Sequence, residues 1–244
     1  MLMYKWMLTG AFLILPMIQS LHAEDTYGLQ RQEMILAIER MVADTRDYTG
    51  KASLAPEVMA AMARVPRHEF IPEESRTYAY ENRPLPIGGG QTISQPYIVA
   101  LMTDLARVDR DSVVLEVGTG SGYQAAILAE LAGQVYSIEI IEELGLNAAK
   151  LLQELGYNNV TVRIGDGYHG WAEQGPFDAI LVTAAPEDIP EPLLQQLAPG
   201  GRLIIPVGAP DGVQSLQVVE KDLNGRITRV PVLPVGFVPL TGDH

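Results

Sequence analysis

The sequence of 244 residues contains no cysteine. This absence excludes a disulfide scaffold, a thiolate nucleophile and a zinc site with sulfur ligands. Histidine is scarce as well, since the four histidines are scattered and show neither HxxxH nor HxxE spacing. We therefore expect no metal site, and any catalytic chemistry must come from other side chains.

Positive charge is also in short supply. Lysine and arginine together number 17 against 30 aspartates and glutamates, which gives a formal net charge of −13. An acidic surface repels a phosphate backbone, so we expect no nucleic-acid partner. Hydrophobic residues make up 47% of the chain and charged residues 19%, a composition typical of a packed globular protein.

The first 23 residues differ in composition from the rest of the chain. Lys5 is followed by an uncharged stretch over 6–21 that Pro16 interrupts, and the first acid is Glu24. A short positive start, an apolar middle and a small residue before a polar region are typical of a secretory signal peptide. The stretch is short for a membrane span. The pattern alone favours export, with a misassigned start codon or an interfacial anchor as alternatives.

The remaining chain divides into two parts, predicted over 24–108 and 109–244. In the first part apolar residues recur at helical spacing, for example Met34, Ile38 and Val42, which predicts helices that face a core. In the second part strands alternate with helices. We expect strands over 112–117, 135–138, 160–164, 179–182 and 202–206, and helices over 123–131, 142–155 and 192–197.

This alternation predicts an α/β fold whose sheet is covered on both faces. Two further apolar stretches, 215–219 and 227–231, flank Asn224-Gly225, a hairpin signal. The expected fold class is therefore a Rossmann-like, mostly parallel sheet with antiparallel C-terminal strands and an N-terminal helical subdomain.

The most specific motif is a glycine loop between the first predicted strand and its helix. Three glycines at alternate positions let the backbone turn tightly and approach a ligand closely. A dinucleotide-binding GxGxxG/A loop would have its third glycine where Tyr123 stands, whereas GxGxG preceded by an acid fits S-adenosylmethionine. Glu116 would hold the cationic methionine end of that cofactor. The loop residues expected to bind it are Glu116, Gly118, Thr119, Gly120, Ser121, Gly122 and Tyr123.

Two more acids stand where this cofactor needs them. Glu139 ends the second predicted strand, 139 − 118 = 21 residues after the first loop glycine, where an acid typically accepts hydrogen bonds from both ribose hydroxyls. Asp166, followed by Gly167, is expected to accept a hydrogen bond from the adenine amino group. Both acids and Glu116 follow or end strands, and open parallel sheets bind ligands at those carboxyl ends.

Several strings together give the chain a resemblance to a known family. The most diagnostic is Gln91-Thr-Ile-Ser-Gln-Pro-Tyr97, and further matching strings lie at 64–72, 116–123, 165–167, 177–186 and 237–241. From about residue 30 to 241 the chain resembles the protein-L-isoaspartate O-methyltransferases. The resemblance implies methyl transfer from S-adenosylmethionine to the free α-carboxylate of L-isoaspartyl residues in damaged proteins or peptides. The methyl ester would then collapse to a succinimide, whose hydrolysis returns some normal aspartate.

The resemblance also implies roles for individual residues. The serine of the diagnostic string, Ser94, would be the catalytic residue. Residues expected to contact the isoaspartyl substrate are Gln91, Thr92 and Ile93, and those expected to line the cofactor or substrate side of the cleft are Thr183 and Thr241. The family is usually cytosolic and is not expected to carry a segment like residues 1–23.

Ser94 also has a purely structural interpretation. Ser94-x-Pro96 before an apolar run is typical of a helix N-cap, and without the resemblance we would favour that role. The two roles are compatible, since a capping serine can present its hydroxyl to a ligand. Arg67 and His68 are expected at the surface or at the edge of the core, without a role.

The expected chemistry asks little of the protein. A carboxylate with a pKa near 4 is already ionised at neutral pH, so no general base is needed. What the protein must supply is alignment of the carboxylate oxygen, the methyl carbon and the sulfonium sulfur.

Two other functions stay open at this point: a methyltransferase of a small molecule, and a non-catalytic binding module. A base methyltransferase is disfavoured, because Thr183-Ala-Ala-Pro186 stands where amino-group methylases of bases carry Asn-Pro-Pro-Tyr. The cofactor is made in the cytosol, so the resemblance and cofactor supply favour the cytoplasm, with the periplasm as the alternative. A membrane would be met only through residues 1–23, if they are not cleaved.

Overall fold

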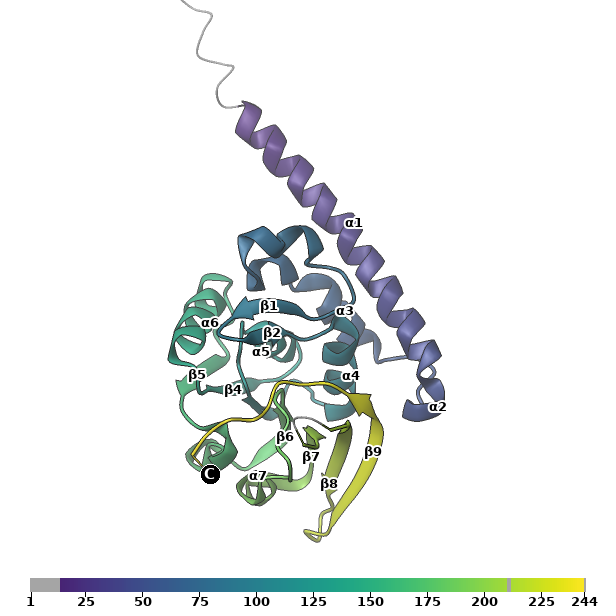
Figure 1. Ribbon diagram of the computed structural model, residues 1–244, viewed down its shortest axis with the longest axis vertical. Coiled ribbons are helices and arrows are strands. Elements are labelled where there is room, and N and C mark those ends of the chain that lie inside the picture. The colour runs from purple at the N-terminus through teal and green to yellow at the C-terminus, as the bar shows by residue number, and fades with distance from the viewer. Residues whose placement is uncertain (1–13, 210–211, 244) are drawn as a thin grey trace, which may run out of the picture.

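The computed structural model describes residues 14–209 and 212–243, with the side chains of residues 14–26 excepted. Residues 1–13, which begin the signal-like segment, lie outside the described residues. Helix α1 (Ile14–Asp44) runs along one side of the molecule, and its second half packs on α3 and α4 (Figure 1). No helix in the described part of the chain combines the length and the apolar character that a membrane crossing needs.

The N-terminal part is mainly helical, as predicted, but it also contains a hairpin. After α1 come α2 (Arg46–Thr49), α3 (Pro56–Arg64), η1 (Arg67–Phe70), η2 (Glu73–Tyr78), β1 (Leu85–Gly88), β2 (Gln91–Ile93) and α4 (Pro96–Ala106). Strands β1 and β2 pair in antiparallel fashion, and their turn contains three consecutive glycines with positive φ (94°, 58° and 74°). The substrate-binding string implied by the resemblance therefore lies on β2 and the start of α4.

The C-terminal part is a sheet of seven strands. Its strands are β3 (Val113–Val117), β4 (Gln134–Glu139), β5 (Val160–Ile164), β6 (Phe177–Val182), β7 (Leu197–Val207), β8 (Gln214–Lys221) and β9 (Ile227–Val235). They lie in the order β5-β4-β3-β6-β7-β8-β9, and the helices that accompany them are α5 (Tyr123–Ala129), α6 (Glu142–Glu154) and α7 (Glu191–Gln196). The pairings from β5 to β7 are parallel, and β8 and β9 are antiparallel to their neighbours. The predicted fold class is confirmed.

Most predicted boundaries agree with the structure to within two residues, and the larger differences are at the start of β7 and the end of β9. Strand β7 begins at Leu197, whereas the sequence predicted a start at 202 after Pro199-Gly200-Gly201. That stretch is part of the strand and gives an irregular register against β6. The hairpin predicted at Asn224-Gly225 is present, with Gly225 at φ 82°.

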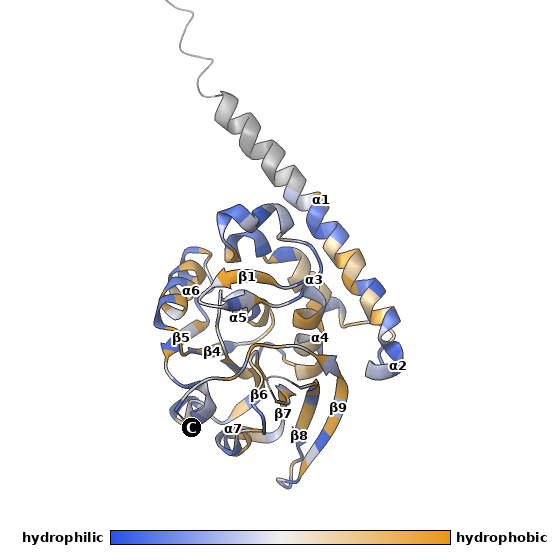
Figure 2. Cartoon of the chain, in the orientation of Figure 1, coloured by the Kyte–Doolittle hydropathy of each residue, from blue (hydrophilic) through white to orange (hydrophobic). Residues whose placement is uncertain are grey.

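Two buried clusters cover the two faces of the sheet. One lies between the sheet and α1, α3, α4 and α5, and it includes Met34, Leu101 and Ile127. The other includes Leu115 and Ile138 and packs against Leu193 of α7. Figure 2 shows how hydrophobic residues concentrate in the strands while the short helix α2 is hydrophilic. Val114 of β3 belongs to the first cluster and its neighbour Leu115 to the second, as expected for a strand buried on both faces.

The order of the strands fixes where a ligand can bind. The chain moves outward from β3 to β4 and β5, and then returns to the other side of β3 to form β6 and β7. A crevice forms outside the carboxyl ends of the strands where the direction of winding reverses. In this protein that point lies between β3 and β6, directly after Val117 and Val182.

Candidate active site

A cavity lies at this reversal point and brings together both groups of residues that the sequence singled out. From the substrate string it is lined by Gln91, Thr92, Ile93 and Ser94. From the predicted cofactor set it is lined by Glu116, Gly118, Thr119, Gly120, Ser121, Tyr123, Glu139, Gly167, Thr183 and Thr241. Gly122 and Asp166 are not among the residues that line it.

The glycine loop has the backbone conformation that its sequence requires. Gly118, Gly120 and Gly122 have φ values of 96°, 53° and 90°, a region that residues with a β-carbon rarely adopt. Gly118 also has a tight neighbour, because a β-carbon at this position would overlap the hydroxyl oxygen of Thr183. That hydroxyl lies 2.6 Å from the carbonyl oxygen of Gly118, to which it donates. The loop following β3 is therefore held by the residue that follows β6.

Glu116 is a buried acid with one satisfied and one unsatisfied oxygen. Its side chain is fully buried on β3, and Oε2 accepts a hydrogen bond from the hydroxyl of Ser137. Oε1 has no hydrogen-bond partner among the described residues. Burial, against the opposing hydrogen bond from Ser137 and together with the nearby carboxylate of Glu139, raises the pKa of Glu116 to about 8. A cationic group in the cavity would satisfy Oε1 and stabilise the ionised form.

Glu139 is held by two main-chain amides. Its carboxylate accepts from the amide of Gly120 at 2.7 Å and from the amide of Ile141 at 2.9 Å. These two bonds connect the glycine loop to the segment leading into α6. A carboxylate can accept about four hydrogen bonds, so capacity for further donors remains.

Asp166 and the aromatic residues after it lie at the periphery of the site. Asp166 Oδ1 accepts from the amide of Tyr168 at 2.9 Å and caps the short helix η3 (Gly167–His169). A β-carbon at Gly242 would overlap the Asp166 carboxylate, so the C-terminal segment covers this acid. Trp171 packs against Tyr136 and beneath the guanidinium of Arg163, 4.3 Å from the ring centroid. An adenine contact by Asp166 stays a prediction.

Ser94 is not the N-cap of α4, so the structural interpretation of this residue is wrong. Gln95 occupies the N-cap position and makes no capping hydrogen bond through its side chain. The amide of Tyr97 donates instead to Asn82 Oδ1 at 3.0 Å. Asn82 lies in the loop before β1. Its side chain supplies the capping acceptor that Ser94 was expected to supply. The half-buried Ser94 side chain lines the cavity.

The β1–β2 hairpin lies against the glycine loop. A β-carbon at Gly120 would lie 3.3 Å from Ile87 Cδ1, and one at Gly89 would lie 3.5 Å from Ile141 Cδ1. The hairpin therefore bridges the predicted cofactor loop and the start of α6. Its second strand continues directly into Ser94.

A second cavity adjoins the first and opens beside β9 and α1. It has a volume of about 420 Å³ and shares Thr92, Ser94, Thr183 and Val238 with the first. Other lining residues include Met41, Tyr97, Leu233, Val235 and Phe237. Among the described residues that line either cavity there is no lysine, arginine or histidine.

Sequence reasoning missed part of the cavity wall. Val238, Pro239 and Leu240 line it because the C-terminal segment pairs with the residues after β6, through hydrogen bonds between Ala185 and both Val238 and Leu240. The string at 237–241 was the only sequence signal for this segment. Other lining residues that were missed are Val99, Val117, Gln124, Ile138, Ile140, Ile141 and Ala184.

Comparison with known proteins places the chain in a family. The sequence profile of the protein-L-isoaspartate(D-aspartate) O-methyltransferases matches residues 39–244. The chain belongs to this family. The protein-L-isoaspartate O-methyltransferase 2 of Syntrophobacter fumaroxidans is 61% identical over 242 residues, covering 97% of this chain and 98% of its own. The protein of the same name from Polaromonas sp. is 63% identical over 211 residues, covering 86% of this chain and 100% of its own.

Solved structures of the family resemble this one. One protein-L-isoaspartate O-methyltransferase has a TM-score of 0.74 at 27% identity, covering 87% of this chain and 66% of its own. A structure assigned to the same activity in Plasmodium falciparum, in complex with S-adenosyl-L-homocysteine, has a TM-score of 0.68 at 26% identity, covering 85% and 98%. The predicted resemblance is confirmed.

The relatives differ in whether they match the N-terminal segment. A match to 97% of 244 residues leaves about seven residues uncovered, so the Syntrophobacter protein has counterparts for most of residues 1–23. The whole Polaromonas protein matches 86% of the chain and leaves about 34 residues without a counterpart. The expectation that relatives lack such a segment is therefore wrong for the first protein.

Proposed function

We propose that this protein methylates the free α-carboxylate of L-isoaspartyl residues in damaged proteins, with S-adenosylmethionine as donor, and so initiates their repair through a succinimide. Family membership and the names of the relatives support the reaction. The assignment of roles rests on one observation: Ser94, Glu116 and the glycine loop line the same cavity.

The residues around the glycine loop fit the donor. S-adenosylmethionine, when bound, supplies an electrophilic methyl group on a positively charged sulfonium. Oε1 of Glu116, which has no partner in the described part of the chain, is a buried acceptor suited to the ammonium group of the methionine end. Glu139 would hold the ribose hydroxyls with its remaining lone pairs, and Thr119, Ser121 and Gly120 would surround them. We expect Thr183, Thr241 and Gly167 to complete this part of the cavity.

The second cavity fits the acceptor. Its lining is uncharged and largely apolar, and it reaches the first cavity at Thr92, Ser94 and Thr183. A peptide lying in it would bring an isoaspartyl carboxylate to the junction of the two cavities. Gln91 and Thr92 would contact that residue. Ile93 is buried in the core and would anchor the strand that carries them. Ser94 would donate a hydrogen bond to the carboxylate and orient it.

The protein needs no general base for this reaction. The acceptor carboxylate is ionised at neutral pH, and one of its oxygens forms a bond to the methyl carbon as the bond from that carbon to sulfur breaks. Both charges disappear in this step, so the uncharged lining of the second cavity favours it. Correct alignment alone can contribute on the order of 7–11 kcal/mol. The described lining residues include no cation that would form an ion pair with the acceptor carboxylate, so its oxygens would stay available for the reaction.

A transfer assay tests the proposal. Labelled methyl should pass from S-adenosylmethionine to an isoaspartyl peptide and not to the same peptide with normal aspartate. Equal labelling of both, or of neither, would contradict the proposal. Transfer to small carboxylic acids alone would favour the small-molecule alternative. Failure to bind S-adenosylmethionine in a calorimetric titration would favour the binding module.

We place the reaction in the cytoplasm, where the donor is made and held. The partners are then proteins and peptides with isoaspartyl residues, without nucleic acid. Export through residues 1–23 to the periplasm is the alternative, and only this segment would contact a membrane, if it is retained. N-terminal sequencing of the native protein from cell fractions distinguishes the two. A start at Met1 in the soluble cytoplasmic fraction is the expected result.

A further inference from the structure

Arg67 is a buried cation with no acidic partner among the residues that the structure describes. Its side chain is fully buried, although the sequence predicted a place at the surface or the edge of the core. Nε donates to the carbonyl of Ala79 at 2.8 Å, and Nη2 donates to the carbonyl of Ser94 at 2.7 Å. No ion pair within the described residues includes Arg67, and its Nη1 has no hydrogen-bond partner there.

The guanidinium also contacts the helix that follows the glycine loop. Its central carbon lies 4.8 Å from the ring centroid of Tyr123, the first residue of α5. Phe70, three residues after Arg67, meets the same ring edge-on with centroids 5.6 Å apart. Tyr123 is itself fully buried and directly follows Gly122. One side chain therefore contacts both the acceptor segment and the end of the cofactor loop.

Burial of this charge is unfavourable by itself. An unpaired buried cation loses its hydration, and packing alone would be served better by an apolar side chain of similar size. Burial lowers the pKa of Arg67 to about 10, which still leaves the group charged at neutral pH. Arginine offers a planar fork that bonds two carbonyls while it lies over an aromatic ring, and no other side chain offers that combination.

We propose that Arg67 is a positioning residue for methyl transfer, which holds the main chain of Ser94 in a fixed place relative to the glycine loop. The inference rests on the proposed function, because it assigns the acceptor to Ser94 and the donor to the loop. Arg67 does not line either cavity. It acts through Ser94 and Tyr123, and it sets the distance between the two reactants rather than the affinity for either.

The test compares Arg67→Lys and Arg67→Gln with the wild-type protein. Lysine keeps the charge, but its single nitrogen cannot reproduce the fork; glutamine keeps donors without the charge. We expect kcat toward an isoaspartyl peptide to fall about tenfold or more in Arg67→Gln, with a smaller fall in Arg67→Lys, since small misplacements reduce rates by up to about 100-fold. The Kd for S-adenosylmethionine and the KM for the peptide should stay within about twofold of wild type.

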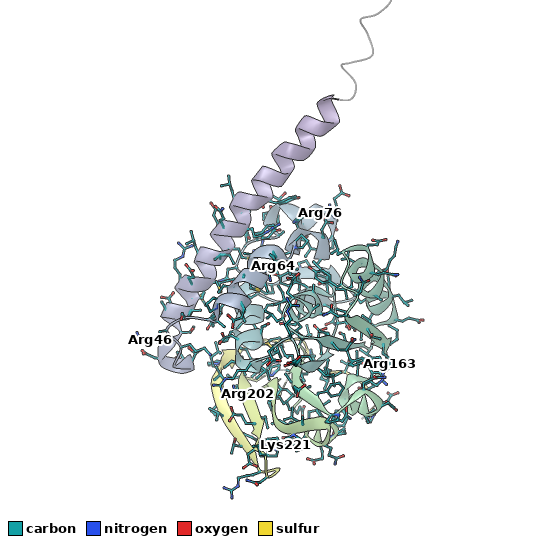
Figure 3. All side chains as sticks on the ribbon, turned by 180° about the vertical axis from the view of Figure 1, so that it is seen from behind. Arg46, Arg64, Arg76, Arg163, Arg202 and Lys221 are labelled. Atoms are coloured by element: carbon teal, nitrogen blue, oxygen red, sulfur yellow. The ribbon has the colours of Figure 1, made fainter. Side chains whose placement is uncertain are left out.

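Arg202→Lys is the matched control. Arg202 also donates to a main-chain carbonyl, that of Leu105 at 3.0 Å, but it lies on β7 and lines neither cavity. Figure 3 shows it beside the C-terminal strands. The turnover of the Arg202→Lys variant should equal that of the wild-type protein. Calorimetric binding of S-adenosylmethionine at full stoichiometry identifies folded protein, so rates are counted per folded molecule.

The outcomes separate this inference from the function on which it rests. An inactive wild-type protein would contradict the proposed function. An active wild type with unchanged kcat in folded Arg67→Gln would overturn the positioning role and leave the function intact. Loss of folding in both variants, or equal rises in the Kd and KM with unchanged kcat, would also overturn it, since Arg67 would then be a stabilising residue.

Discussion

The hydroxyl oxygen of Thr183 occupies the space in which a β-carbon of residue 118 would lie. Residue 118 follows β3 and residue 183 follows β6, so this contact joins the two strands on either side of the reversal point. Two independent features therefore require glycine at position 118: its φ of 96°, and the Thr183 hydroxyl, which leaves no room for a β-carbon.

Gly118→Ala should therefore weaken both folding and donor binding. A strained φ costs about 1–3 kcal/mol, and displacement of Thr183 breaks its hydrogen bond to the loop. We expect a lower free energy of unfolding by denaturant and a large rise in the Kd for S-adenosylmethionine. The double variant Gly118→Ala/Thr183→Ala should regain part of the stability, because the overlap is removed. Additive losses in the double variant would show that the two residues do not interact.

Glu116 should make the ligand-free protein less stable as pH rises. Its pKa is about 8 in the folded protein against an ordinary value of 4.5, so the folded state binds a proton that the unfolded state has lost. The stability from this group is complete below pH 4.5 and falls as pH rises toward 8, by a few kcal/mol. Comparison of urea unfolding at pH 6 and pH 8 in wild type and Glu116→Gln measures it. The difference between the two pH values should shrink in the variant.

Binding of the donor should release this proton. A cationic ammonium group beside Oε1 favours the carboxylate and lowers its pKa. At pH 7 the binding heat should therefore differ between buffers with different ionisation enthalpies, by an amount that corresponds to up to one proton. Glu116→Gln should reduce the released fraction and weaken binding. A buffer-independent heat in the wild type would mean that Glu116 keeps its protonation state on binding.

Ser94→Ala and Asn82→Ala should change different properties, turnover in the first variant and stability in the second. Because Asn82 caps α4, its replacement should lower stability by about 0.5–2 kcal/mol, with donor affinity nearly unchanged. Ser94→Ala should leave the thermal unfolding temperature nearly unchanged and greatly reduce turnover, with donor affinity intact. Full turnover in Ser94→Ala would remove this residue from the mechanism.

Glu139→Ala should weaken donor binding more than Glu139→Gln. Alanine removes the acceptors of the Gly120 and Ile141 amides, and it also removes the expected acceptor of the ribose hydroxyls. Glutamine keeps one oxygen for these donors. Calorimetric Kd values for the two variants, with circular dichroism as a folding control, check the order. Unchanged affinity in Glu139→Ala would exclude the ribose role.

The sequence predicted the local features of the site better than the contacts between distant segments. The glycine loop and the strand-end acids follow from short patterns, and the parallel sheet brings the loop together with Glu116 and Glu139, while Asp166 does not line the cavity. The β1–β2 hairpin was missed because strands of four and three residues are too short to show a period of two.

Arg67 and Asn82 show a second limit. Charged residues are rarely fully buried, so the sequence predicted that Arg67 lies near the surface. The two carbonyls to which it donates come from distant parts of the chain and are known only from the structure. Capping is usually local, which made Ser94 the obvious cap. The segment at 238–240 reaches the cavity through pairing with Ala185, and no local pattern encodes a contact across more than 50 residues.

The hairpin has a mechanical consequence. Ile87 of β1 lies against the glycine loop at Gly120, and the paired strand β2 leads directly into Ser94. A shift that lifts Ile87 away from the loop also carries the strand leading to Ser94. In the proposed reaction, donor binding and acceptor orientation would therefore both depend on this hairpin, and we expect a substitution in it to change both.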